Sequence, residues 1–96
     1  MMGKRHLHIG FNWGDGDPRI STLTPIFNKA IDWIRYAPNC WIVWTSSSPE
    51  TWYGRLKPLL GEKDSLFIVE INVAERQGWL SRSIWDWLKK KERTPT

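Results

Sequence analysis

One stretch decides the fold: Trp33-Ile34-Arg35-Tyr36-Ala37-Pro38-Asn39-Cys40-Trp41-Ile42-Val43-Trp44-Thr45. β-Branched and aromatic residues, which suit half-buried strands, lie on both sides of a short break. In that break Pro38 fixes φ and Asn39 tolerates left-handed backbone geometry, so the chain can turn there. The stretch therefore predicts a β-hairpin with strands at Trp33–Tyr36 and Cys40–Thr45.

Two further strands are expected outside the hairpin. Apolar and other residues alternate with a period of two over Leu7–Phe11, and Ser65–Val73 alternates in the same way. Like Cys40–Thr45, the segment Ser65–Val73 carries apolar residues on both faces. A sheet built from these strands needs cover on both sides.

Helical spacing of apolar residues predicts three helices. The first spans Thr22–Asp32, and the second spans Pro49–Leu60, with Pro58 expected to end or kink it. A closing helix with Ser81 or Ser83 as its N-cap carries five apolar residues, namely Leu80, Ile84, Trp85, Trp87 and Leu88.

The resulting order, β-α-β-β-α-β plus a helix, predicts an α+β fold. It is the split βαβ order of a ferredoxin-like sandwich, in which two helices lie on one face of a four-stranded antiparallel sheet. The other face is then covered by the closing helix or by a second subunit. We expect one domain over residues 1–92 and a frayed tail over 93–96.

Composition limits the classes of function. The 96 residues carry a net charge of +4, partly from the basic run at residues 89–93, which either attracts polyanions or solubilises the chain end. The single cysteine, Cys40, excludes an intrachain disulfide and a cysteine metal cage, and we expect it to be a buried, inert thiol. No apolar run approaches the ~18 residues of a membrane span, which favours a cytoplasmic protein.

The loop after the first strand holds the candidate catalytic residues, Asp15 and Asp17. With Asn12 at the strand end they offer the oxygen ligands that suit Mg²⁺ or Mn²⁺. The alternative is that Asp-Gly-Asp-Pro simply forms a turn, in which case no cofactor is required. The glycines of this loop match neither the phosphate-loop pattern nor the dinucleotide fingerprint.

His6 and His8 lie two residues apart, on one face of the first strand. Their imidazoles have the right spacing to share a proton-transfer or metal-binding role. No third ligand is evident, so surface or interface histidines are the alternative.

Cations interleave with aromatic residues among the eight tryptophans. Such pairs can stack bases and hold phosphates, and the alternative is that the indoles fill the core or a dimer interface. The candidate ligand-binding residues are Trp13, Arg19, Arg35, Tyr36, Arg55 and Arg82.

Several short motifs resemble those of a known group of proteins. They are Trp33-x-Arg35-Tyr36 with Cys40-Trp41-Ile42-Val43, then Arg55-Leu56-x-Pro58-Leu59-Leu60, Asp64-x-Leu66-Phe67-x-Val69, Gly78-Trp79-Leu80 and Trp87-Leu88. Together they resemble small phage and bacterial SinR-like proteins of the ferredoxin-like superfamily, which includes the small CRISPR-associated adaptation nuclease and the virulence-associated D toxins. The resemblance covers roughly residues 6–90 and implies a ferredoxin-like homodimer.

In the nuclease members of that superfamily, an aspartate at the end of the first strand helps to hold a divalent metal between two subunits. The matching position here is Asn12, a weaker ligand, which favours a non-catalytic relative. We therefore expect a homodimeric protein, of phage or mobile-element context, that binds nucleic acid or a phosphate-bearing ligand. The alternatives are a Mg²⁺- or Mn²⁺-dependent nuclease using Asp15 and Asp17, and a protein-interaction module that inhibits a host system.

Overall fold

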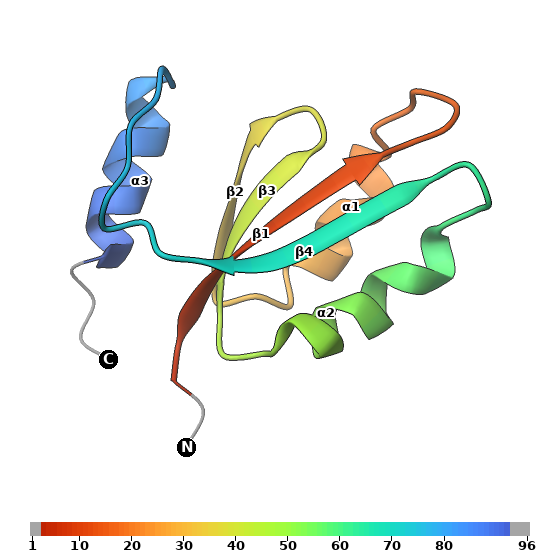
Figure 1. Cartoon of the computed structure of the whole chain (residues 1–96), viewed down its shortest axis with the longest axis horizontal. Coiled ribbons are helices and arrows are strands. Elements are labelled where there is room, and N and C mark those ends of the chain that lie inside the picture. Colours follow the sequence, from red (N-terminus) through yellow and green to blue (C-terminus); the bar gives the residue numbers. More distant parts are fainter. Residues whose placement is uncertain (1–2, 93–96) are drawn as a thin grey trace.

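The computed structural model describes residues 3–92, which form an α+β fold (Figure 1). The four strands make one open sheet in the order β2-β3-β1-β4, and every neighbouring pair is antiparallel. This confirms the predicted fold class and sheet type; the tail expected to fray, 93–96, lies outside the described residues. The elements in chain order are β1 (Arg5–Asn12), α1 (Ile20–Phe27), β2 (Asp32–Ala37), β3 (Cys40–Thr45), α2 (Pro49–Leu56), β4 (Ser65–Ile71) and α3 (Arg82–Glu92).

The predicted hairpin is present as β2 and β3. Its strands pair from Asp32 opposite Trp44 to Ala37 opposite Cys40, so Pro38 and Asn39 make the turn. A register shift between Arg35 and Ala37 interrupts the pairing near this turn. The hairpin forms one side of the sheet, with β2 at the edge.

The first helix is shorter than the sequence predicts. α1 ends at Phe27 instead of continuing to Asp32, because residues 28–31 turn back toward the sheet. The N–H of Ala30 donates to Phe27 O at 2.9 Å, and the N–H of Ile31 donates to Trp44 O at 2.9 Å. The residues whose apolar spacing predicts another helical turn therefore lead into β2, where the chain pairs with β3.

The second helix breaks near the predicted proline. α2 ends at Leu56, and a 3₁₀ turn follows at Lys57–Leu59. Pro58 has no N–H to continue the α-helical bonding, which accounts for the change. No helix within residues 3–92 is both long enough and apolar enough to cross a membrane.

One face of the sheet packs on α1 and α2 and forms the main core (Figure 1). At its centre the ring of Phe27 stacks on Trp41, with centroids 4.0 Å apart, and on Trp52 at 5.6 Å. These three side chains come from α1, β3 and α2 and are fully buried. The aromatic stack thus joins both helices to the sheet.

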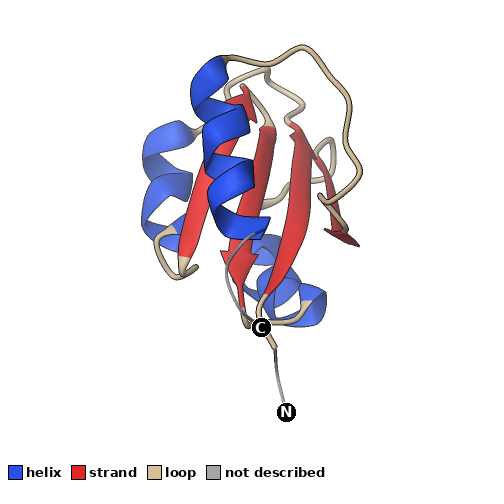
Figure 2. Ribbon diagram, turned by 90° about the vertical axis from the view of Figure 1, so that its left-hand side faces the viewer, coloured by secondary structure: helices blue, strands red, loops and turns tan. Residues whose placement is uncertain are grey.

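α3 lies across the opposite face (Figure 2). Its Ile84 and Leu88 pack with Ile42 of β3 and with Val73, forming a second, smaller core. Of the two covers predicted for this face, the closing helix is therefore present. Its cover is partial, because Phe67 of β4 remains 66% exposed.

Candidate functional site

The acidic loop after β1 is organised around one arginine. Arg19 donates from Nη2 to Asp15 Oδ2 at 2.8 Å and from Nη1 to Asp64 Oδ2 at 3.4 Å. Its guanidinium lies 4.2 Å from the ring centroid of Trp13, which is buried. The backbone of Arg19 is left-handed, with φ at 55°, an uncommon conformation for a side chain of this size. Arg19 thus forms an ion pair with Asp15, one of the two candidate catalytic residues.

The carboxylates around Arg19 also accept backbone hydrogen bonds. Asp15 accepts from the N–H of Asp17, and Asp17 accepts from the N–H of Arg19. Asp64 accepts from the N–H of Gly14 and of Gly61, both at 2.7 Å. These backbone bonds, followed by Arg19, lower the pKa of Asp15 and of Asp64 below the ordinary range. Both carboxyl groups are therefore ionised and engaged at neutral pH.

Asp64 was not among the residues predicted from the sequence. It joins the start of β4 to the loop after β1, across a separation of 50 residues from Gly14. In the sequence it stands in one of the resemblance motifs and follows Gly61 in the turn that precedes β4. Such a position suggests a turn residue and says nothing about a distant partner.

The predicted metal role of Asn12, Asp15 and Asp17 stays a prediction. Asn12 lies at the end of β1 and pairs with Ser65. Within residues 3–92, no group of three or more histidine, cysteine, aspartate or glutamate side chains is placed to hold a metal ion. What the structure does provide at Asp15 is the ion pair with Arg19.

The six predicted ligand-binding residues are spread over the loop after β1, strand β2, and helices α2 and α3. Besides Arg19 on Trp13, Arg55 of α2 lies 4.7 Å from the ring centroid of Trp52. Arg35 of β2 lies 5.9 Å from the Trp41 ring. Each of these three arginines thus lies over a different, buried indole.

The remaining two candidates are Tyr36 on β2 and Arg82, which is exposed at the start of α3. The contacts described for the six do not bring them together on one surface, and their binding role stays a prediction. Four of the eight tryptophans are buried, namely Trp13, Trp41, Trp44 and Trp52, whereas Trp79 is fully exposed.

The two histidines have separate surroundings. His8 Nε2 lies 2.6 Å from the hydroxyl of Tyr36. Burial, with a hydrogen bond to the Cys40 thiol as a smaller cause, raises the pKa of Tyr36 to about 12. The tyrosine is therefore protonated at neutral pH. Cys40 is half-buried, whereas the sequence had suggested a buried thiol.

His6 packs under α3 at the other end of the same strand face. Its ring lies 4.5 Å from Trp44 and 6.0 Å from Trp87, and the side chain is only 7% exposed. Its Nε2 is buried and has no hydrogen-bond partner within the described residues. Burial, and secondarily the charge of Lys91, lowers the pKa of His6, so the imidazole is neutral at neutral pH.

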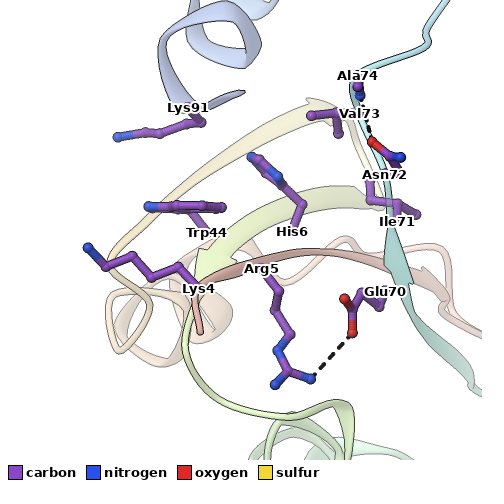
Figure 3. A pocket seen from close by; sticks show the side chains of 10 residues that line it. All are labelled: Lys4, Arg5, His6, Trp44, Glu70, Ile71, Asn72, Val73, Ala74 and Lys91. Carbon is purple, nitrogen blue, oxygen red and sulfur yellow. Dashed lines mark hydrogen bonds and ion pairs between the residues drawn. The ribbon is translucent and has the colours of Figure 1, made fainter. Parts of the chain in front are cut away.

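Around His6 the first residues of β1 meet the last turn of α3, at a hollow of about 390 Å³ (Figure 3). Lys4, Arg5 and Lys91 contribute cationic side chains to its lining, and Glu70 contributes the one acidic group. The exposed side chains of Lys89 and Lys90 lie on the same last turn of α3. We call this region the basic end.

Two ion pairs connect the basic end to the rest of the fold. Lys91 Nζ lies 2.8 Å from Asp32 Oδ2, which also accepts from Trp87 Nε1 at 3.1 Å. Arg5 Nη1 lies 3.3 Å from Glu70 Oε1. Lysine and arginine have further N–H donors beyond those used in these pairs. The cations are thus held in place while keeping donors for an anion.

The sequence shows the basic run at residues 89–93, but it does not show that Lys91 of this run meets Lys4 and Arg5. That contact depends on the fold, which brings together residues from both ends of the described chain.

Comparisons with family models, with curated proteins and with solved structures give no match. The resemblance to SinR-like proteins therefore stays a prediction.

Proposed function

We propose that this chain is a small non-catalytic protein of ferredoxin-like architecture that binds nucleic acid through its phosphate groups at the basic end. The observation that carries the proposal is the meeting of Lys4 and Arg5 with the last turn of α3 around one hollow. Contacts from lysine and arginine to phosphate supply most of the affinity in sequence-independent nucleic-acid binding.

The architecture supports the ferredoxin-like part of the proposal. The chain order alternates strand, helix, strand, strand, helix and strand, and the sheet order is β2-β3-β1-β4. A split βαβ arrangement has this connectivity, with two helices on one face. α3 is the addition to that arrangement, and it brings the lysines of the basic end.

The acidic loop supports the non-catalytic part of the proposal. A carboxylate that recruits a hard divalent cation works best when its oxygens are not already committed. Asp15 is paired with Arg19 at 2.8 Å, and its second oxygen accepts a backbone N–H. The loop is therefore arranged as a structural turn closed by an arginine.

Binding is tested by fluorescence anisotropy with labelled single-stranded and duplex oligonucleotides between about 50 and 200 mM salt. The logarithm of the binding constant should fall linearly with the logarithm of salt concentration. No binding at low salt, or a flat salt response, contradicts the proposal. Competition by inorganic phosphate or a mononucleotide at low millimolar concentration would instead identify a small phosphate-bearing ligand.

Charge reversal locates the site. The double variant Lys4→Glu/Lys89→Glu should weaken binding and reduce the salt slope by about one for each phosphate that the protein no longer neutralises. Lys57→Glu, at the end of α2, makes the same change in charge per residue away from the basic end and is the control. Equal effects of the reversals at Lys57 and at the basic end would rule out binding at the basic end.

The same oligonucleotides test the nuclease alternative. We expect no cleavage with Mg²⁺ or Mn²⁺ beyond that seen with a chelator. Metal-dependent cleavage that Asp15→Ala abolishes would establish the nuclease in place of the non-catalytic protein.

A further inference from the structure

β4 is an edge strand, since it is the last strand in the order β2-β3-β1-β4. The hydrogen bonding of β1 shows which backbone groups of β4 point away from the sheet. The N–H of Phe11 donates to Asn39 O at 3.0 Å, so the odd-numbered residues of β1 point their backbone groups toward β3. The even-numbered residues then point theirs toward β4, where Gly10 lies opposite Phe67.

The backbone groups of β4 alternate in the same way. Since Phe67 exchanges bonds with β1, its neighbours along the strand point their N–H and C=O groups away from the sheet. These outward residues are Leu66, Ile68 and Glu70. In the described part of the chain no strand pairs with this side of β4. The edge offers three residues in position to pair with another strand.

Glu70 is the one charged residue of β4, which otherwise lacks the features that commonly protect an edge strand. Ser65–Ile71 contains no proline, lysine or arginine, and its pairing with β1 runs without a bulge. Phe67 is 66% exposed on the strand. The other edge strand, β2, differs because it carries the exposed Arg35 and an irregularity in register beside it.

We propose that a second copy of this chain pairs with β4 in antiparallel fashion, about a two-fold axis at Ile68. The two four-stranded sheets would then form one continuous eight-stranded sheet. In this register Ile68 lies opposite its own counterpart, and Leu66 lies opposite Glu70. The outward N–H and C=O groups of all three residues are satisfied by this pairing.

The side chains are compatible with this register. Phe67 of one copy lies opposite Val69 of the other, on the face that carries α3, and each pair occurs twice. Aromatic and β-branched residues are a favourable cross-strand pair. Glu70 faces an apolar residue, so no like charges oppose each other along the seam.

The distribution of charge also favours a second copy of the chain as the partner of β4. At the start of β4 three carboxylates, Asp15, Glu62 and Asp64, outnumber the cations Arg19 and Lys63, whereas at its end Lys4, Arg5 and Lys91 outnumber Glu70. Antiparallel pairing brings the acidic end of one copy alongside the basic end of the other. The attraction between the ends would steer the two copies into this orientation.

The proposal rests on the edge of β4 and not on anion binding, and it is tested without nucleic acid, by sedimentation equilibrium over a range of protein concentrations. An interface confined to one strand edge is at the small end of the range for specific contacts, so we expect a dimer that dissociates on dilution. A chain that is monomeric at the highest concentrations measured would overturn the proposal.

Two variants test the register. Phe67→Lys and Val69→Glu each replace one member of the cross-strand pair, and each should weaken self-association by about tenfold or more. Ile31→Lys is the matched control, because Ile31 is also an exposed apolar residue, 54% accessible, but lies outside β4. Far-ultraviolet circular dichroism should show that all three variants keep the fold.

An equimolar mixture of Phe67→Lys and Val69→Glu distinguishes this register from other contacts. In the mixed dimer one seam position pairs lysine with glutamate and the other restores phenylalanine with valine. Association of the mixture should therefore exceed that of either variant alone. A mixture no stronger than the separate variants, or unchanged association in both variants, would refute the proposed two-fold axis.

Discussion

The phenyl ring of Phe27 and the indole of Trp41 lie face to face, with centroids 4.0 Å apart and planes 5° from parallel. Trp52 also stacks on Phe27, with centroids 5.6 Å apart. Because these side chains are fully buried, the contact between α1, α2 and the sheet depends on a few large rings packed closely together.

Removing the central ring should therefore cost much of the stability. Phe27→Ala should lower the free energy of unfolding by about 3–5 kcal/mol, through the loss of buried apolar surface and the cavity left behind. Urea denaturation followed by circular dichroism measures the change. Tyr53→Ala, at a position 46% exposed, is the control and should cost less than about 1 kcal/mol. Similar costs for both variants would contradict the packing at Phe27.

The backbone of Arg19 gives a second prediction. At a φ of 55° an alanine is strained and a glycine is not, although both remove the guanidinium and its ion pairs. Arg19→Gly should therefore be more stable than Arg19→Ala by about 1 kcal/mol, and both should be less stable than the parent chain. Thermal or urea unfolding of the three proteins provides the comparison. An alanine variant at least as stable as the glycine variant would contradict the left-handed conformation.

His6 should make stability depend on pH near neutrality. Burial, and secondarily Lys91, lowers the pKa of His6 in the folded protein below the ordinary value of 6.5. The unfolded chain then binds a proton more readily than the folded protein. The full contribution of His6 to the free energy of unfolding is therefore present above about pH 6.5, and it is lost as the pH falls from this value to the pKa of the folded protein.

The measurement compares unfolding free energies between about pH 7.5 and 5.5 in the parent chain and in His6→Phe. The variant should have a flatter profile. Some slope should remain, because burial also lowers the pKa of His8. Identical slopes in the two proteins would show that His6 does not titrate differently on folding.

Asp32 should make the stability of the fold depend on pH in a more acidic range. Burial raises its pKa, but hydrogen bonds from Lys91, the Trp33 N–H and Trp87 outweigh this, and the folded pKa lies below the ordinary value of 3.8. Its contribution is present above that value and disappears as the pH falls through the folded pKa. Asp32→Asn should therefore cost about 0.5–1 kcal/mol at pH 7 and much less in strong acid.

Chemical denaturation of both proteins across this pH range tests the prediction, because the two stability curves should converge as the pH falls. A constant difference between the curves would mean that the cost comes from packing, not from charge.

The sequence was most informative where neighbouring residues decide the structure. The runs on either side of Pro38 predicted the hairpin, and Pro58 predicted the break after α2. Local periodicity failed at the end of α1, because the hydrogen bond from Ile31 to Trp44 belongs to the sheet and not to the helix. A periodic pattern carries no information about such competition.

The candidate site was harder to predict for the same reason. Asp15 and Asp17 are candidate metal ligands in the sequence, but the ion pairs of Arg19 with Asp15 and with the distant Asp64 depend on the fold. The basic end depends on Lys4 and Lys91, which are brought together only by the complete fold. Spacing along a sequence identifies groups of this kind only when they share one element.

The position of β1 also has a consequence for synthesis on the ribosome. Of the four strands of this sheet β1 emerges first, yet it is internal in the sheet and pairs with β3 and with β4, which emerges last of the four. A nascent chain that has passed β3 still has one side of β1 without its partner. Completion of the fold must therefore wait until β4 has left the exit tunnel, and until then β1 is an exposed edge on which chaperones can act.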